Sequence, residues 1–138
     1  MKSDPPWRDA YGQLKLPFLK ATGQILDGDF HVACPNCVTH TLRFYYHVFN
    51  HAKSTGTIWS WCPQCRLTAH LPRVDSEKWQ FPDPYQNVSL DAFADMETAS
   101  DQPFLSRLDA LWDQGKIGLP TPVTAEAREQ THPSRRRR

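Results

Sequence analysis

The 138-residue sequence predicts a small α+β protein, with a three-stranded antiparallel sheet held by two cysteine pairs and flanked by helical arms. Three observations support this prediction. The cysteine pairs share one spacing, the residues around them are rich in aromatic and β-branched types, and an apolar stripe at helical spacing follows later. We divide the chain into an N-terminal arm that packs on the sheet, the cysteine-bearing sheet, an acidic linker with helices, and a disordered basic tail: residues 1–29, 30–74, 75–118 and 119–138.

The N-terminal arm is expected to cover one face of the sheet. Trp7, Tyr11 and Leu14 have helical spacing, and Pro17 is expected to break that pattern. Asp27–Gly28 is typical of a turn leading toward the first cysteine pair.

Three strands are expected at residues 39–50, 57–62 and 66–74. Alternate residues of the first strand give two faces that both carry large apolar side chains. A small sheet usually leaves one face to water, so the second face needs cover from this chain or from a partner. In the first interpretation both arms pack on the sheet. In the second, some of its aromatic residues are exposed and bind a partner: Tyr45, Phe49, Trp59 and Trp61.

Two helices are expected in the acidic part of the chain, at residues 89–100 and 101–118. The second has the clearer apolar stripe, with Pro103 suited to its first turn and Gly115 able to end it. Asp109 and Asp113 are expected on the face opposite the stripe. This helix either packs on the sheet or docks on another protein, in which case the predicted contact residues are Asp109, Trp112 and Asp113.

The charge distribution is uneven although the net charge is only +1. Residues 30–74 contain no Asp or Glu, residues 75–113 hold nine acidic residues against two basic ones, and the chain ends in four arginines. Such asymmetry indicates either a polyanionic partner or packing of the acidic arm on the middle. No apolar run approaches the roughly 20 residues needed to span a bilayer. The first residues also lack the apolar region of a signal peptide, so we expect a cytoplasmic protein without membrane contact.

The four cysteines are the predicted metal ligands: Cys34, Cys37, Cys62 and Cys65. In a cytosolic chain, paired CxxC motifs are more often metal sites than disulfides. Four thiolates form the tetrahedral shell of structural zinc, although iron is a less favoured alternative. Such a shell has no open coordination position, so we expect one structural zinc rather than a hydrolytic centre. The sequence also has no nucleophile motif, no glycine-rich phosphate loop and no HExxH motif, so we expect no catalytic residues and no small-molecule substrate. His31 and His70 lie near the cysteines, and because four cysteines suffice they are expected either to donate hydrogen bonds to the ligands or to be ordinary strand residues.

The motifs CPNC and CPQC, 24 residues apart, resemble those of the zinc-ribbon family over residues 30–74. The resemblance implies two metal-binding knuckles on β-hairpins around one zinc ion. It implies no particular function, because zinc ribbons occur in transcription factors, ribosomal proteins, enzymes and protein-binding adaptors.

Our preferred functional hypothesis is a non-enzymatic protein that binds and caps another protein, since separate positive and negative zones suit oriented docking. The stretches RFYYHVFN, GTIWSWCPQC and FLSRLDALWDQGKI resemble small bacterial zinc-ribbon immunity proteins, which implies binding to a toxin and blocking of its active site. The alternative is a nucleic-acid-binding ribbon, favoured by the acid-free middle, the aromatic residues and the arginine tail. Against this alternative, the middle has only four Lys or Arg residues, and zinc with four thiolates adds a net charge of −2. A third hypothesis, a rubredoxin-like iron protein for electron transfer, fits the four sulfurs but not the arms.

Overall fold

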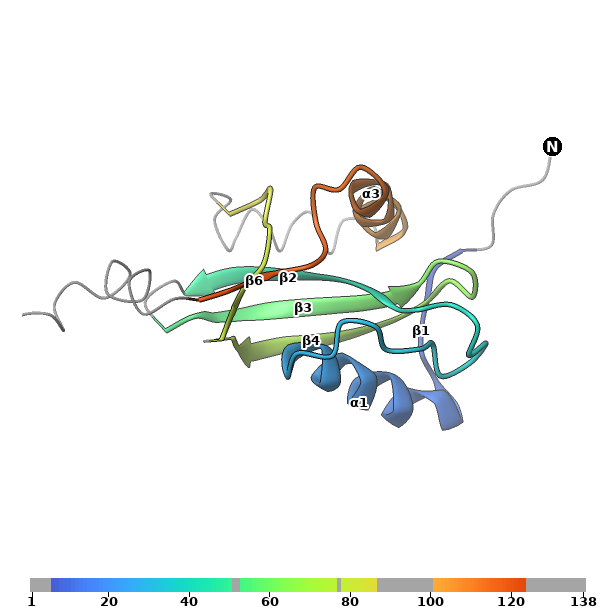
Figure 1. Cartoon of the computed structure of the whole chain (residues 1–138). Helices are drawn as coiled ribbons and strands as arrows, with labels where there is room; N and C mark the ends of the chain where they lie inside the picture. Colours follow the sequence, from blue (N-terminus) through green and yellow to red (C-terminus); the bar gives the residue numbers. More distant parts are fainter. Residues whose placement is uncertain (1–5, 51–52, 77, 87–100, 124–138) are drawn as a thin grey trace, which may run out of the picture.

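The computed structural model describes residues 6–50, 53–76, 78–86 and 101–123. It is a small α+β fold in which a mixed four-stranded sheet lies between two helices, one on each face (Figure 1). The helices are α1 (Lys15–Leu26) and α3 (Asp101–Asp113), and a short 3-10 turn, η1 (Gly12–Leu14), precedes α1. The sheet order is β1-β4-β3-β2, with bounds Arg8–Asp9, Leu67–Asp75, Thr55–Cys62 and Arg43–Asn50. A separate two-stranded sheet pairs β5 (Trp79–Gln80) with β6 (Thr121–Pro122).

The three predicted strands are present as β2, β3 and β4, and they form an antiparallel meander. The predicted sheet was wrong in one respect, because β1 adds a fourth strand parallel to β4. The Arg8 amide donates to the Arg66 carbonyl at 2.9 Å, and the Ala10 amide donates to the Thr68 carbonyl at 2.8 Å. A two-residue strand is too short to leave a periodic signal in the sequence.

Helix α1 covers one face of the sheet, but it does not follow the predicted pattern. Pro17 does not break a helix; it lies in the first turn of α1. Amide groups of a first turn have no partner within the helix, so the missing N–H of proline costs little there. Phe18, Ala21 and Ile25 have helical spacing and are buried against the sheet.

Helix α3 covers the other face, so the interpretation in which the chain covers its own sheet is confirmed for this face. Tyr45, Trp59 and Trp61 are only 1%, 4% and 0% exposed, and they pack with Phe104 and Leu108 of α3. The prediction that these three residues form an exposed recognition surface is therefore wrong. Burial of large aromatic side chains stabilises the fold more than exposure would.

Helix α3 ends as the sequence predicts, although at Asp113 rather than at residue 118. Gly115 has a φ of +74°, its amide donates to the Trp112 carbonyl, and the Lys116 amide donates to the Leu111 carbonyl. These two bonds form a Schellman motif, which favours glycine at the left-handed position.

Parts of the predicted arms lie outside the described residues. This applies to the predicted helix at 89–100 and to residues 124–138 of the predicted tail. The beginning of that tail is ordered, because Trp79 pairs with Pro122 and the Val123 amide donates to the Lys78 carbonyl at 2.9 Å. Neither helix in the described part of the chain is long and apolar enough to cross a membrane.

Candidate metal centre

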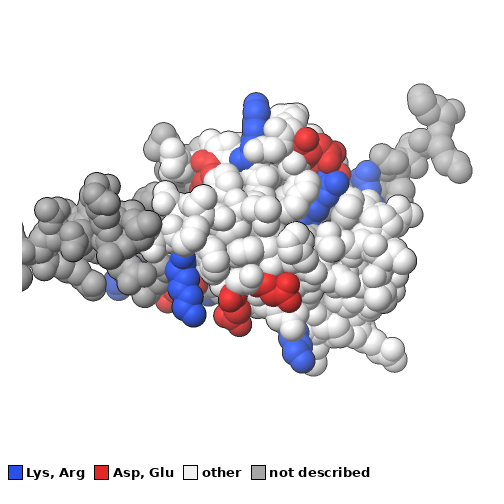
Figure 2. All heavy atoms as spheres, viewed as in Figure 1, with Lys and Arg blue, Asp and Glu red and all other residues white. Residues whose placement is uncertain are grey.

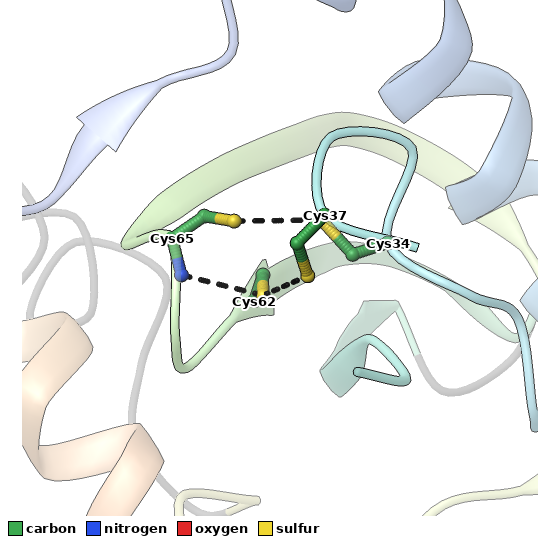
Figure 3. A group of neighbouring side chains, drawn as sticks. All are labelled: Cys34, Cys37, Cys62 and Cys65. Carbon is green, nitrogen blue, oxygen red and sulfur yellow. Dashed lines mark hydrogen bonds between the residues drawn. The ribbon is translucent and has the colours of Figure 1, made fainter. Parts of the chain in front are cut away.

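The four cysteines meet at one end of the sheet (Figure 3). Cys34 and Cys37 lie in the loop before β2, Cys62 is the last residue of β3, and Cys65 lies in the turn to β4. Their sulfur atoms all lie within 4.8 Å of one another. The distances between the two pairs are 3.9 Å for Cys34–Cys65 and 3.8 Å for Cys37–Cys62.

The two CPxC turns have the same backbone conformation. In each, the residue after the second cysteine has a left-handed φ, +64° for Val38 and +61° for Arg66. Its amide donates to the carbonyl of the first cysteine, Cys34 or Cys62, at 2.9 Å. A positive φ is unfavourable for valine because its side chain branches at Cβ. We call these turns the first and second knuckle. Each contains a residue in a strained backbone conformation, Val38 or Arg66, which the tight turn requires.

Each sulfur atom has a nitrogen atom within 3.6 Å. Two of these nitrogens are backbone amides within the same knuckle, and two belong to side chains. The four pairs are Asn36 N with Cys34 Sγ (3.3 Å), His40 Nδ1 with Cys37 Sγ (3.6 Å), Cys65 N with Cys62 Sγ (3.4 Å) and Asn36 Nδ2 with Cys65 Sγ (3.2 Å). N–H donors to sulfur stabilise thiolates, which are the form that binds metal.

The geometry fits a tetrahedral metal ion. With Zn–S bonds of about 2.3 Å, the edges of a tetrahedral sulfur shell are about 3.8 Å long. Two of the four sulfur–sulfur distances between the knuckles, 3.8 and 3.9 Å, match this length, and all sulfurs lie within 4.8 Å of one another. A disulfide requires about 2.05 Å, and all four cysteines are free. These thiols could therefore hold one metal ion, and both zinc and iron occupy sites of this kind.

The thiols differ in their readiness to ionise when no cation is present. Burial raises the pKa of Cys34, and it raises that of Cys62 to about 12. Hydrogen bonding to Thr39 lowers the pKa of Cys37 to about 5, with a smaller contribution from His40. Burial makes ionisation of these thiols unfavourable, but the positive charge of a bound divalent cation would offset that cost. Thiols that coordinate a metal ion lose their protons.

The other predicted contact residues lie elsewhere and do not join the cysteines. Asp109 was predicted to face away from the sheet, but its carboxylate accepts hydrogen bonds from Arg43 at 2.8 Å and from Trp61 at 2.9 Å. The predicted position was wrong because Trp61 and Arg43, on two strands of the sheet, both donate to this carboxylate. Asp113 is paired with Arg43 at 3.0 Å, but its side chain is 64% exposed. Trp112 is half-buried, and its ring contacts the ring of Phe44. Phe49 is also half-buried.

Two polar residues near the cysteines, Asn36 and His40, were not predicted from the sequence. Asn36 and His40 contact the sulfurs, a role for which the sequence offers His31 and His70 as candidates. His70 instead stacks on the ring of Trp59 at 4.4 Å. The position of His40, three residues after Cys37, was the signal that could have revealed it.

The buried His47 contacts the carboxylate of Asp83, which lies 36 residues later in the sequence. His47 Nδ1 lies 2.9 Å from Asp83 Oδ2, and the Tyr45 hydroxyl donates to the other oxygen of the same carboxylate. His47 is 1% exposed, and these contacts tie the chain after β5 to β2.

No family model matches this chain, and neither the curated proteins nor the solved structures contain a match to it. The resemblances to zinc ribbons and to immunity proteins therefore stay predictions from the motifs.

Proposed function

We propose that this chain is a non-enzymatic zinc-binding protein of zinc-ribbon type, in which one ion joins the two knuckles. The observation that carries the proposal is the meeting of four free thiols within 4.8 Å, with distances of 3.8 and 3.9 Å between the knuckles. When bound, zinc would neutralise part of the thiolate charge and link the loop before β2 to the turn after β3. Four protein ligands leave no open position for water or substrate, which favours a structural role.

Native mass spectrometry combined with elemental analysis tests the metal. We expect one zinc per chain and a colourless protein. Strong visible absorption would indicate a ferric four-sulfur centre and the electron-transfer hypothesis. Failure of the reduced protein to bind either metal would overturn the proposal.

The surface favours a protein partner over a nucleic acid. Cations are scattered among acidic residues in the view of Figure 2, without a continuous basic patch. Four arginines also lie over aromatic rings of their own chain, which reduces their freedom to contact phosphates: Arg8 over Tyr11, Arg43 over Trp112, Arg66 over Trp7 and Arg73 over Phe49. The aromatic residues suggested as stacking platforms for bases, Tyr45, Trp59 and Trp61, are buried.

We propose that the partner binds near the knuckles. The two knuckles and the loop around the first, residues 30–42 and 62–65, contain no Lys, Arg, Asp or Glu, and the centres of protein interfaces are depleted of charge in the same way. Val38 is 68% exposed at the tip of the first knuckle. The resemblance to immunity proteins implies that this partner is a toxin domain, which the surface near the knuckles would cap.

Affinity purification from the cells that produce the protein tests this role. We expect a specific protein to co-purify with the wild type and to be lost from the Val38→Asn variant. Asparagine tolerates the left-handed backbone, so this change removes the apolar side chain without added strain. Lys20→Glu, at an exposed position of α1, is the control and should retain the partner. Recovery of nuclease-sensitive RNA or DNA instead would support the alternative function.

A further inference from the structure

Asn36 contacts both knuckles. Its backbone amide donates to Cys34 Sγ in its own knuckle at 3.3 Å. Its side-chain amide donates to Cys65 Sγ in the other knuckle at 3.2 Å, across 29 residues of sequence. One residue therefore bonds to a sulfur of each pair.

Cys65 depends on this contact more than the other cysteines depend on their partners. The nitrogen partners of Cys34, Cys37 and Cys62 come from within four residues of each of them. Among the described residues, Cys65 is the one whose nitrogen partner comes from the opposite knuckle. Within the described part of the chain, Asn36 Nδ2 is the nitrogen donor to this sulfur, so removing the Asn36 side chain would take that hydrogen bond away.

The second knuckle provides an internal comparison. Gln64 occupies the position in CPQC that Asn36 occupies in CPNC, and both residues are exposed. Within the described part of the chain, the Gln64 side chain makes no hydrogen bond to a sulfur, and the contact between the knuckles is therefore one-sided. The two knuckles share the same turn geometry, yet the contact between them is made by the Asn36 side chain and has no counterpart from Gln64 among the described residues.

We propose that Asn36 is a positioning residue of the metal centre, whose side-chain amide donates to Cys65 Sγ and holds this sulfur toward the first knuckle. This inference rests on the proposed zinc-binding function. Four thiolates around one Zn²⁺ carry a net charge of −2, so each N–H donor to sulfur lowers the cost of gathering them. Partners that orient metal ligands typically change metal affinity by about 10- to 100-fold when removed.

Zinc affinity, measured by competition with a chromophoric chelator under reducing conditions, tests the proposal. We expect Asn36→Ala to bind zinc about 10- to 100-fold more weakly than the wild type. Gln64→Ala removes a side-chain amide from the matching position and should keep the wild-type affinity. Equal affinities for these two variants would overturn the inference.

Cobalt substitution separates positioning from a general loss of structure. The sulfur-to-cobalt charge-transfer band reports the electron density on the thiolates. We expect it to shift in Asn36→Ala and to stay in place in Gln64→Ala. An unshifted band in Asn36→Ala would contradict the proposal even if the affinity fell.

The near-isosteric variant Asn36→Asp keeps the size of the side chain, and it provides the test if the alanine variant folds poorly. A carboxylate is an acceptor with a negative charge, so we expect weaker zinc binding than in Asn36→Ala. Binding as tight as in the wild type would count against the proposal. If the wild type itself binds no zinc, the proposed function fails; if it binds one zinc and both Asn36 variants match it, only the role of Asn36 fails.

Discussion

The indole of Trp61 donates to the carboxylate of Asp109 at 2.9 Å, and this bond joins β3 to α3 across 48 residues. Trp61 is fully buried, and the same carboxylate oxygen accepts a hydrogen bond from Arg43 at 2.8 Å. The acidic arm therefore uses part of its charge within the molecule. Asp109 anchors the helix that covers the aromatic face of the sheet.

Replacing Asp109 by alanine should destabilise the protein by about 1–3 kcal/mol, because the buried indole N–H loses its acceptor. Asp113→Ala removes a carboxylate from the same arginine at an exposed position, and its effect should stay within about 1 kcal/mol. Urea unfolding of the zinc-loaded variants measures both changes. Equal effects of the two substitutions would argue against Asp109 as the anchor.

Removing one metal ligand should affect folding as well as metal content. We expect Cys62→Ser to lose zinc and to unfold at least the knuckles and the adjacent strands, because metal-binding energy is folding energy in small sites. A strong chelator should have the same effect on the wild type, and added zinc should reverse it. Circular dichroism and zinc content report the outcome. A metal-free protein of unchanged stability would refute a structural metal.

Gly56 should tolerate no side chain. A Cβ at this position would lie 2.2 Å from the backbone oxygen of His47 on the neighbouring strand, so the strands would have to separate. We expect Gly56→Ala to destabilise the protein by more than about 2 kcal/mol, as other overpacked sites do. Gly23→Ala is the control, since open space surrounds this position in α1. It should stabilise the protein by about 0.5–1 kcal/mol, and thermal unfolding distinguishes the two results.

The buried tyrosines should make the protein sensitive to alkali. Burial raises the pKa of Tyr46 above its usual value, with a further contribution from the charge of Asp75. Its hydroxyl lies within hydrogen-bond distance of the carbonyls of Ser54 and Val74, at 2.8 and 2.9 Å. Since the pKa is higher in the folded state, the stability is fully present below about pH 10 and is lost as the pH rises further.

The variant Tyr46→Phe checks this assignment. Its free energy of unfolding should fall less steeply above about pH 10 than that of the wild type. Some slope should persist, because burial raises the pKa of Tyr45 as well. At neutral pH the loss of the hydroxyl should cost about 1 kcal/mol. Stability curves of equal slope for the two proteins would show that Tyr46 does not titrate in this way.

Local patterns made part of this structure predictable. Three strands, the left-handed Gly115 that follows the end of α3 and the two CPxC turns all depend on residues that are close in sequence. A left-handed glycine ends a helix through bonds to its own last turn, and alternating apolar residues favour a strand whatever packs on it. The convergence of the four thiols could also be predicted, because a tetrahedral site requires two pairs and the chain has two.

The sequence by itself determined which residues form the candidate metal centre and where the three main strands lie along the chain. Only the tertiary structure decided which surfaces are accessible, because burial depends on segments that meet across long stretches of chain. It buried Tyr45, Trp59 and Trp61 under α3, and it turned Asp109 toward Trp61. It also brought Asn36 to Cys65, a contact that depends on how two knuckles face each other rather than on either motif.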